Sequence, residues 1–309
     1  MSLKKESRSD AHLHQAAMNG DVRKLRRILD SGKVHVDCRD KDGTTPLILA
    51  AANGQLECVK ELLEQGADPA AKRTTGTTAL FFASQCGYLD IAQVLLDNGA
   101  PLDSTSVDGG SPLFVACQCG HMDVVKELVA RGANINTHMK DKATPVFIAA
   151  QNGHFKIMLF LLAHGANPDS RRNDGASPLW IASQMGHDTI VRQLLKAGAK
   201  VDVVRRDGAT PLFKAAHKGY THVVAELLKY KPSLGLLPNG ETALHAAALF
   251  GQLSVCKQLV AAGADLNLRN QEGQTALQVA SDNKQFPVRD YLRNVAAMKT
   301  NGYINNKML

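Results

Sequence analysis

Three histidines recur at a spacing of 33 residues, and a metal centre is the first chemistry that His121, His154 and His187 suggest. Helices in contact lie about 8–10 Å apart, whereas zinc needs its nitrogen ligands at about 2.0–2.1 Å. Side chains one repeat apart are therefore badly placed to share an ion, and we expect a packing role. Cys117 and Cys119 are also expected to be packing and surface residues, because positions two apart on a helix point to different sides.

The sequence lacks the signatures of common catalytic sites. It has no phosphate-binding GxxxxGK[ST] loop, no HExxH zinc helix and no GxSxG nucleophile elbow. The segment from Gly235 to Gly240 has the spacing of the phosphate loop, but Glu241 stands where that loop needs lysine. We therefore predict that the chain is not an enzyme, needs no cofactor and has no small-molecule substrate.

Composition indicates a soluble protein with a core along its whole length. Of the 309 residues, 44% are hydrophobic and 21% are charged. The start, MSLKKESRSD, has no apolar secretory signal, and no apolar run approaches the roughly 20 residues of a membrane span. The six cysteines form no CxxC pair, as expected of reduced thiols. We expect a cytoplasmic protein that binds no membrane, with the nucleus as the alternative compartment.

A short motif, TTPLILAAANG in its first clear copy, recurs through most of the chain. Its Pro or Ala returns every 33 residues from Pro46 to Pro211, and the series continues at Ala243 after one residue is lost. A second glycine keeps the same phase from Gly66 to Gly198. Two series in one phase indicate a repeat protein.

Each repeat is predicted to contain two helices and a tight turn. A hydroxyl residue such as Thr45 caps the first helix, with Pro or Ala at the first helical position. A glycine such as Gly54 ends this helix, because glycine tolerates the left-handed conformation found there. Apolar residues at helical spacing, such as Val59, Leu62 and Leu63, mark the second helix. Asp-Gly pairs then predict a turn.

The pattern T-P-L-x-x-A-A-x-x-G followed by L-L-x-x-G-A-D/N resembles the ankyrin repeat. The resemblance implies an all-α repeat solenoid, with β-hairpin-like fingers between helix pairs and about nine units. Such a unit cannot bury its own apolar face, so its neighbours supply the core and the outer units act as caps. The expected boundaries are a disordered start at 1–9, repeats at 10–41, 42–74, 75–107, 108–140, 141–173, 174–206, 207–238, 239–271 and 272–298, and a disordered tail at 299–309.

Five aromatic residues stand where the ankyrin pattern has the histidine of T-P-L-H: Phe81, Phe114, Phe147, Trp180 and Phe213. Only His14 and His245 keep the histidine. We expect the rings to form a buried spine, because aromatic burial contributes strongly to core stability. Exposed rings would instead favour a binding role.

The resemblance also implies that partners bind on the concave face, at the finger tips and at the two residues before the glycine that ends each first helix. Four successive repeats have glutamine there: Gln85, Gln118, Gln151 and Gln184. A glutamine amide donates and accepts hydrogen bonds, so this series could pair with an extended peptide. It could equally be a set of ordinary helix-forming surface residues. The other expected contacts are Met185, Arg206, Lys218, Leu249 and Phe250.

The charge of the fingers is mixed, and the chain has a formal net charge of +7. Basic residues such as Arg172 and Arg205 alternate with aspartates such as Asp174 and Asp207. Either a solvated charged edge or a surface for an acidic partner fits this pattern. Nucleic-acid binding is not expected, because a clustered basic face with stacking aromatics is missing.

One irregularity interrupts the repeat between Leu228 and Gly240. Lys231-Pro232 replaces Gly-Ala, one residue is missing, and the segment Leu234–Pro238 is unusually apolar. The leucines could fold inward to plug the shortened turn. With Leu249 and Phe250 nearby, they could instead form a hydrophobic docking spot.

These observations predict a protein-interaction module or scaffold whose partner is a protein or extended peptide. The alternative is an adaptor or substrate receptor for an enzyme complex such as a ubiquitin ligase. The resemblance further implies asparaginyl hydroxylation as a modification of the fingers, with Asn136 and Asn267 at the matching positions.

Overall fold

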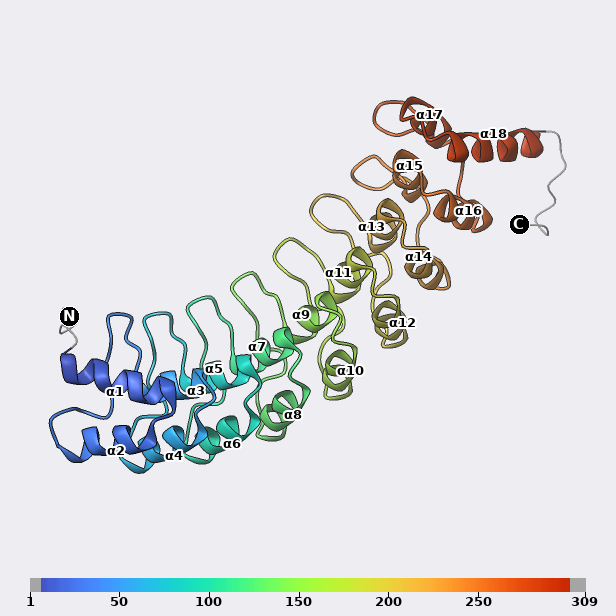
Figure 1. Cartoon of the computed structure of the whole chain (residues 1–309). Coiled ribbons are helices and arrows are strands. Elements are labelled where there is room, and N and C mark those ends of the chain that lie inside the picture. Colours follow the sequence, from blue (N-terminus) through green and yellow to red (C-terminus); the bar gives the residue numbers. More distant parts are fainter. Residues whose placement is uncertain (1–6, 301–309) are drawn as a thin grey trace. The chain divides into compact units, whose positions relative to one another are not determined.

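The computed structural model describes residues 7–300, which form eighteen helices and no strand. The helices come in nine pairs, each a first helix followed by a second helix (Figure 1). Their bounds are α1 (Arg8–Asn19), α2 (Val22–Asp30), α3 (Pro46–Ala52), α4 (Leu56–Glu64), α5 (Ala79–Cys86), α6 (Leu89–Asp97), α7 (Pro112–Cys119), α8 (Met122–Ala130), α9 (Pro145–Gln151), α10 (Phe155–Ala163), α11 (Pro178–Met185), α12 (Asp188–Lys196), α13 (Pro211–Lys218), α14 (Thr221–Leu228), α15 (Ala243–Leu249), α16 (Leu253–Ala261), α17 (Ala276–Asp282) and α18 (Phe286–Thr300). The expected all-helical repeat architecture is confirmed.

The chain divides into two compact units. Unit 1 runs to Ala149 and includes Ala163–Ala166, and unit 2 comprises Ala150–Leu162 and the residues from Asn167 onward. In unit 1 the first helices α1, α3, α5 and α7 pack side by side in one row, and the second helices α2, α4, α6 and α8 form another (Figure 1). Unit 2 repeats this arrangement, with α11, α13, α15 and α17 in one row and α12, α14, α16 and α18 in the other.

The first helices begin as the sequence predicts. Thr45 and Ser177 have extended backbone conformations, and their hydroxyl oxygens accept hydrogen bonds from the N–H groups of Ile48 and Trp180. Pro46 and Pro178 then occupy the first helical position. These caps satisfy N–H groups that have no partner inside the helix, so the local sequence alone sets where each first helix starts.

Lysines take the left-handed backbone conformation where the repeat lacks its usual glycine. Lys142, Lys231 and Lys284 have φ angles of 66°, 51° and 58°, and each is in phase with glycines of other repeats. After Lys231, the buried Pro232 fills the place that alanine takes elsewhere. The repeat backbone therefore continues through the irregular segment, despite a conformational cost that glycine would avoid.

The fingers are tight turns closed by backbone hydrogen bonds. In one finger of unit 2 the N–H of Arg172 donates to the carbonyl of Ala176 at 2.9 Å. Neighbouring fingers are also joined, since the N–H of Arg206 donates to the carbonyl of Asp174 at 2.9 Å. In unit 1 the N–H of Thr74 donates to Asp42 in the same way. These bonds hold successive finger tips in register.

Three of the five expected spine residues are buried. Phe114, Phe147 and Trp180 are 4%, 1% and 1% exposed, so the prediction of interior rings is confirmed for them. Phe81 and Phe213 are only half-buried, so the prediction is wrong for these two. Phe81 lines an open groove instead, which is described below.

Both ends of the helical array extend past the predicted limits. Ser7 caps α1, and Arg8 and Ser9 form its first turn, so the disordered start expected over 1–9 is wrong at these positions. The helix α18 continues to Thr300, beyond the limit expected at 298. The rest of the expected disordered start and tail, 1–6 and 301–309, lies outside the described residues. Within residues 7–300, no helix has the combination of length and apolar character that crossing a membrane requires.

Candidate protein-binding surface

In unit 1, Gln85 and Gln118 lie at the C-terminal ends of two first helices that pack side by side. Both side chains are exposed, as a binding role requires. Both also line a groove of about 360 Å³ between the first helices and the fingers. The structure thus brings these two predicted residues together at one concave feature.

The lining of this groove combines apolar and polar residues. Phe81, Phe82, Phe114 and Met139 contribute the apolar surface, and the two glutamines and Thr75 contribute polar groups. The guanidinium of Arg73 lies 5.7 Å from the centre of the Phe82 ring. An apolar hollow of this size with a few polar groups around it is typical of a binding pocket.

The other two predicted glutamines belong to unit 2. Gln151 ends α9 and Gln184 stands one residue before the end of α11, and both are half-buried. The backbone carbonyl of Gln151 is hydrogen bonded to the Nε2 atom of His187 at 3.0 Å. The four glutamines are therefore placed as two pairs, one in each unit, and the pair in unit 1 is the more accessible.

The remaining predicted contacts are exposed at the helix ends and finger tips of unit 2. Met185 is 48% exposed and Phe250 is 46% exposed, and Leu249, Lys218 and Arg206 are exposed as well. The Phe250 ring packs at 4.1 Å, centre to centre, on the imidazole of His217. Burial lowers the pKa of His217, and Lys214 and Lys218 lower it further. An uncharged imidazole at neutral pH suits contact with an aromatic ring.

The apolar segment Leu234–Pro238 fits neither of its two interpretations completely. Leu236 is 49% exposed, as docking would require, whereas Leu234 and Leu237 are half-buried. The N–H of Leu237 donates to the carbonyl of Glu241 at 2.9 Å, which closes the finger. Leu236 is thus the one leucine of the segment that presents a largely open side chain.

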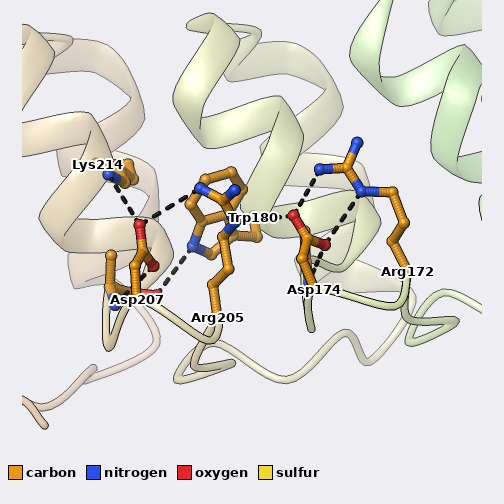
Figure 2. A network of polar contacts seen from close by, with 8 residues as sticks. Arg172, Asp174, Trp180, Arg205, Asp207 and Lys214 are labelled. Carbon is orange, nitrogen blue, oxygen red and sulfur yellow. Dashed lines mark hydrogen bonds and ion pairs between the residues drawn. The ribbon is translucent and has the colours of Figure 1, made fainter. Parts of the chain in front are cut away.

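A network of polar contacts among arginines, aspartates and Lys214 links the fingers of unit 2, as Figure 2 shows. The Nε atoms of Arg172 and Arg205 donate to the two oxygens of Asp174, at 3.1 and 2.9 Å. The Nη1 atom of Arg205 and the Nζ atom of Lys214 lie 3.3 and 3.4 Å from Asp207 Oδ2. The Arg205 guanidinium also lies over the buried ring of Trp180, 4.9 Å from its centre. The network therefore joins two fingers to the core.

This network decides the charge of the finger surface. The hydrogen bond from Arg172, with further bonds from Ala176 and Arg205, holds the pKa of Asp174 well below its usual range. Asp174 is thus ionised, and both Asp174 and Asp207 are already paired with basic side chains. Arg206 and Lys218 have no carboxylate within ion-pair distance among residues 7–300, so they leave this surface with uncompensated positive charge.

Substituting Asp174 by asparagine should make the protein less sensitive to acid. A carboxyl whose pKa is lowered by folding stabilises the native state above its unfolded pKa, about 3.9, and this contribution is lost as pH falls through the native pKa. We expect D174N to lower the free energy of unfolding by about 1–2 kcal/mol at neutral pH and by less below about pH 4. Urea unfolding at a series of pH values measures this.

The exposed pair of Asp123 and Lys126, 3.6 Å apart, supplies the control. D123N is expected to change the stability by less than about 0.5 kcal/mol at any pH, because exposed ion pairs contribute little. Equal acid sensitivity of wild type and D174N would contradict a stabilising role for the network.

His121 and His187 act as caps, a role that sequence reasoning missed. The Nε2 atoms of His121 and His187 are hydrogen bonded to the carbonyls of Gln85 and Gln151, at 2.9 and 3.0 Å, near the ends of the preceding first helices. The ring of His121 lies so close to Gly87 that a Cβ there would be 2.5 Å from Nδ1. Each of these histidines directly follows the glycine that ends the first helix of its own repeat, Gly120 or Gly186, and this position was the available signal.

Buried carboxylates that join adjacent second helices were also missed. Glu61 is buried and pairs with Arg26 of the preceding repeat, while Glu226 accepts a hydrogen bond from Arg192 Nη2 at 2.9 Å. These arginine bonds lower the pKa values of both carboxyls. The repeat spacing predicts which helices are neighbours. It does not predict which charged side chains of neighbouring helices form ion pairs.

The expected modification sites are accessible. Asn136 and Asn267 are exposed in fingers, and their backbone N–H groups donate to Asn134 and Asp265 two residues earlier. Hydroxylation there stays a prediction, which peptide mass spectrometry would test as the gain of one oxygen. Among residues 7–300 no group of three metal-binding side chains could hold an ion.

Comparison with known proteins identifies the repeat. A family model described as "Ankyrin repeats (3 copies)" matches residues 13–106, 99–172, 179–270 and 233–301. Ankyrin repeat domain-containing protein 29 of Homo sapiens is 48% identical over 68 residues, which is 22% of this chain and 23% of that protein. DNA-binding protein RFXANK of Homo sapiens is 46% identical over 57 residues, 18% of this chain and 22% of that protein. E3 ubiquitin-protein ligase KEG of Arabidopsis thaliana is 41% identical over 56 residues, 18% of this chain and 3% of that protein. The matches thus cover less than a quarter of each relative.

Proposed function

Because this chain belongs to the ankyrin repeat family, whose repeats are protein-interaction modules, we propose that it binds an extended segment of a partner protein along its first helices and fingers. This is a non-enzymatic function. The groove in unit 1 is the observation that carries it, since an apolar hollow and two exposed glutamines lie together there.

The chemistry of the groove suits a main chain with one apolar side chain. The amides of Gln85 and Gln118 can donate to a peptide carbonyl and accept from a peptide N–H. An apolar side chain of the same segment would enter between Phe82, Phe114 and Met139, where it would lose its contact with water. When an extended peptide binds in this way, hydrogen bonds to its main chain supply the affinity, and the apolar pocket for its side chain supplies the specificity.

The surface of unit 2 is proposed as a second contact. Met185, Leu249 and Phe250 offer exposed apolar area, and Arg206 and Lys218 add positive charge without carboxylate partners in the described chain. A segment with acidic and apolar residues complements this combination. Large exposed apolar side chains at the ends of two first helices, α11 and α15, also favour contact with a protein over plain solvent exposure.

The alternative is an adaptor or substrate receptor for an enzyme complex. One relative is named an E3 ubiquitin-protein ligase, and this repeat match favours a role beside such an enzyme. The two functions differ in the partners that they imply. An adaptor would have ligase subunits among its stable partners, whereas a scaffold need not.

Proximity labelling in intact cells, followed by pull-down with the purified chain, tests the proposal. We expect Gln85→Ala with Gln118→Ala to weaken partner binding about 10-fold, since two main-chain hydrogen bonds of about 0.5–1.5 kcal/mol each are lost. Phe250→Ala with Lys218→Glu is expected to weaken a partner that uses unit 2. Enrichment of ligase subunits would favour the adaptor.

The matched control replaces Gln193 and Lys196 by alanine, on α12 in the row of second helices. It should retain every partner, and all variants should melt within a few degrees of wild type. If the glutamine variant and the control bind each partner equally well, the glutamines are ordinary surface residues and the groove has no binding role.

A further inference from the structure

A second pocket, of about 350 Å³, lies in the first helix pair and is unrelated to the surface described above. It is lined by His12 of α1, by Lys24 and Arg27 of α2, and by Lys33 in the loop that follows. Lys24, Arg27 and Ser31 share one face of the chain's second helix and its end, because they are spaced by three and four residues. All four nitrogen-bearing side chains are exposed and surround one hollow.

The positive charge of this pocket is not balanced by the fold. Its lining contains no carboxylate, and Lys24, Arg27 and Lys33 have no ion pair with any residue in the described range 7–300. Nearby cations behave differently, since Arg26 pairs with Glu61 and Lys60 pairs with Glu57. Three like charges around one hollow repel one another and favour an anion between them.

The other lining residues indicate what kind of anion fits. Ile28 is half-buried and Val34 is buried, so one wall of the pocket is apolar. The Ser31 hydroxyl donates to the carbonyl of Ile28 at 2.6 Å and is therefore fixed in place. A guanidinium can hold two oxygens of a phosphate, and lysine ammonium groups bind phosphate as compact charges. The volume of the pocket exceeds that of one phosphate group, so the pocket also has room for the residues attached to the phosphate.

We propose that this pocket binds a phosphoserine or phosphothreonine segment of a protein, with the phosphate among Lys24, Arg27 and Lys33 and the neighbouring peptide against Ile28 and Val34. Nucleic acid is a poorer match, because His12 is the only ring in the lining on which a base could stack. A membrane surface is also a poorer match, because the pocket offers no exposed large apolar side chain for insertion.

Fluorescence anisotropy with the full chain tests this proposal. Two labelled peptide libraries, degenerate around a fixed phosphoserine or around serine, serve as probes. The phosphoserine library is expected to bind at least about 10-fold more tightly, the effect of one charge-assisted hydrogen bond or more. Lys24→Gln, Arg27→Gln and Lys33→Gln together should abolish that difference.

The control variant carries Lys156→Gln, Lys196→Gln and Arg293→Gln, which remove the same charge from exposed helix positions elsewhere. It should keep the preference for phosphoserine to within about twofold, and circular dichroism should show both variants folded. Equal binding of the two libraries, or equal loss in both variants, would overturn the proposal. Tight binding to phosphatidylserine vesicles without a preference for phosphoserine would also overturn it.

Discussion

Replacing Trp180 by alanine is expected to lower the free energy of unfolding by about 3–5 kcal/mol. The side chain is 1% exposed and is the largest fully buried residue in the described structure. Its removal leaves a cavity that the surrounding helices can fill only partly. It also frees the carbonyl of Ala209, which accepts a hydrogen bond from Trp180 Nε1 at 2.9 Å. The Arg205 guanidinium would lose the ring over which it lies.

Two further substitutions separate packing from hydrogen bonding. Trp180→Phe keeps most of the buried ring but leaves the Ala209 carbonyl without its donor, so we expect a loss of about 1–3 kcal/mol. Phe250→Ala removes an aromatic ring that is 46% exposed, and a loss below about 1 kcal/mol is expected. Urea unfolding measures all three variants. If W180A were no less stable than F250A, the ring would not be a core residue.

The indole of Trp180 takes over the bond that histidine makes in other repeats. His14 Nε2 lies 3.2 Å from the carbonyl of Cys38, and His245 Nε2 lies 3.0 Å from that of Gln274. In all three cases a buried ring nitrogen reaches the finger that follows. An indole N–H can only donate, so Trp180 provides this bond without depending on a tautomer.

Replacing Gly208 by alanine is expected to lower the free energy of unfolding by about 2–5 kcal/mol. Gly208 has a φ of +78°, where an alanine is strained by about 1–2 kcal/mol. A Cβ would also lie 2.6 Å from the backbone N of Asn239 and 2.8 Å from its Cβ. Backbone atoms cannot rotate away, so relief of this overlap requires the two fingers to shift, at about 1–3 kcal/mol.

Gly198 is the matched control, because its φ is +86° and a Cβ there would meet nothing within 4 Å. Gly198→Ala should therefore cost only the conformational strain, about 1–2 kcal/mol. The difference between the two variants, read from urea unfolding, isolates the contact between fingers. Equal losses would show that the fingers of Gly208 and Asn239 tolerate an extra methyl group.

The sequence by itself determined the elements, the period and the family. Hydroxyl residues such as Thr45 and Ser177 cap the first helices, and the following proline suits the first helical turn. These signals act within four residues, so they can be identified without a structure. Their repetition every 33 residues then predicts nine helix pairs, because one pair alone cannot bury its apolar face. The three lysines with a left-handed backbone conformation also stand at repeat positions that glycine occupies in other repeats.

Only the tertiary structure decided which side chains are accessible and which are paired. Trp180 reaches a carbonyl 29 residues away, and Arg192 pairs with a carboxylate 34 residues away. Which of these partners meet depends on the rotation of each helix about its own axis and on the position of each finger against its neighbour. No local sequence pattern specifies either of these. For this reason Phe81 opens onto a groove while Phe147 is buried, although both occupy the same repeat position. For the same reason Lys24 and Arg27 surround a pocket while Arg26, between them in sequence, is paired with Glu61.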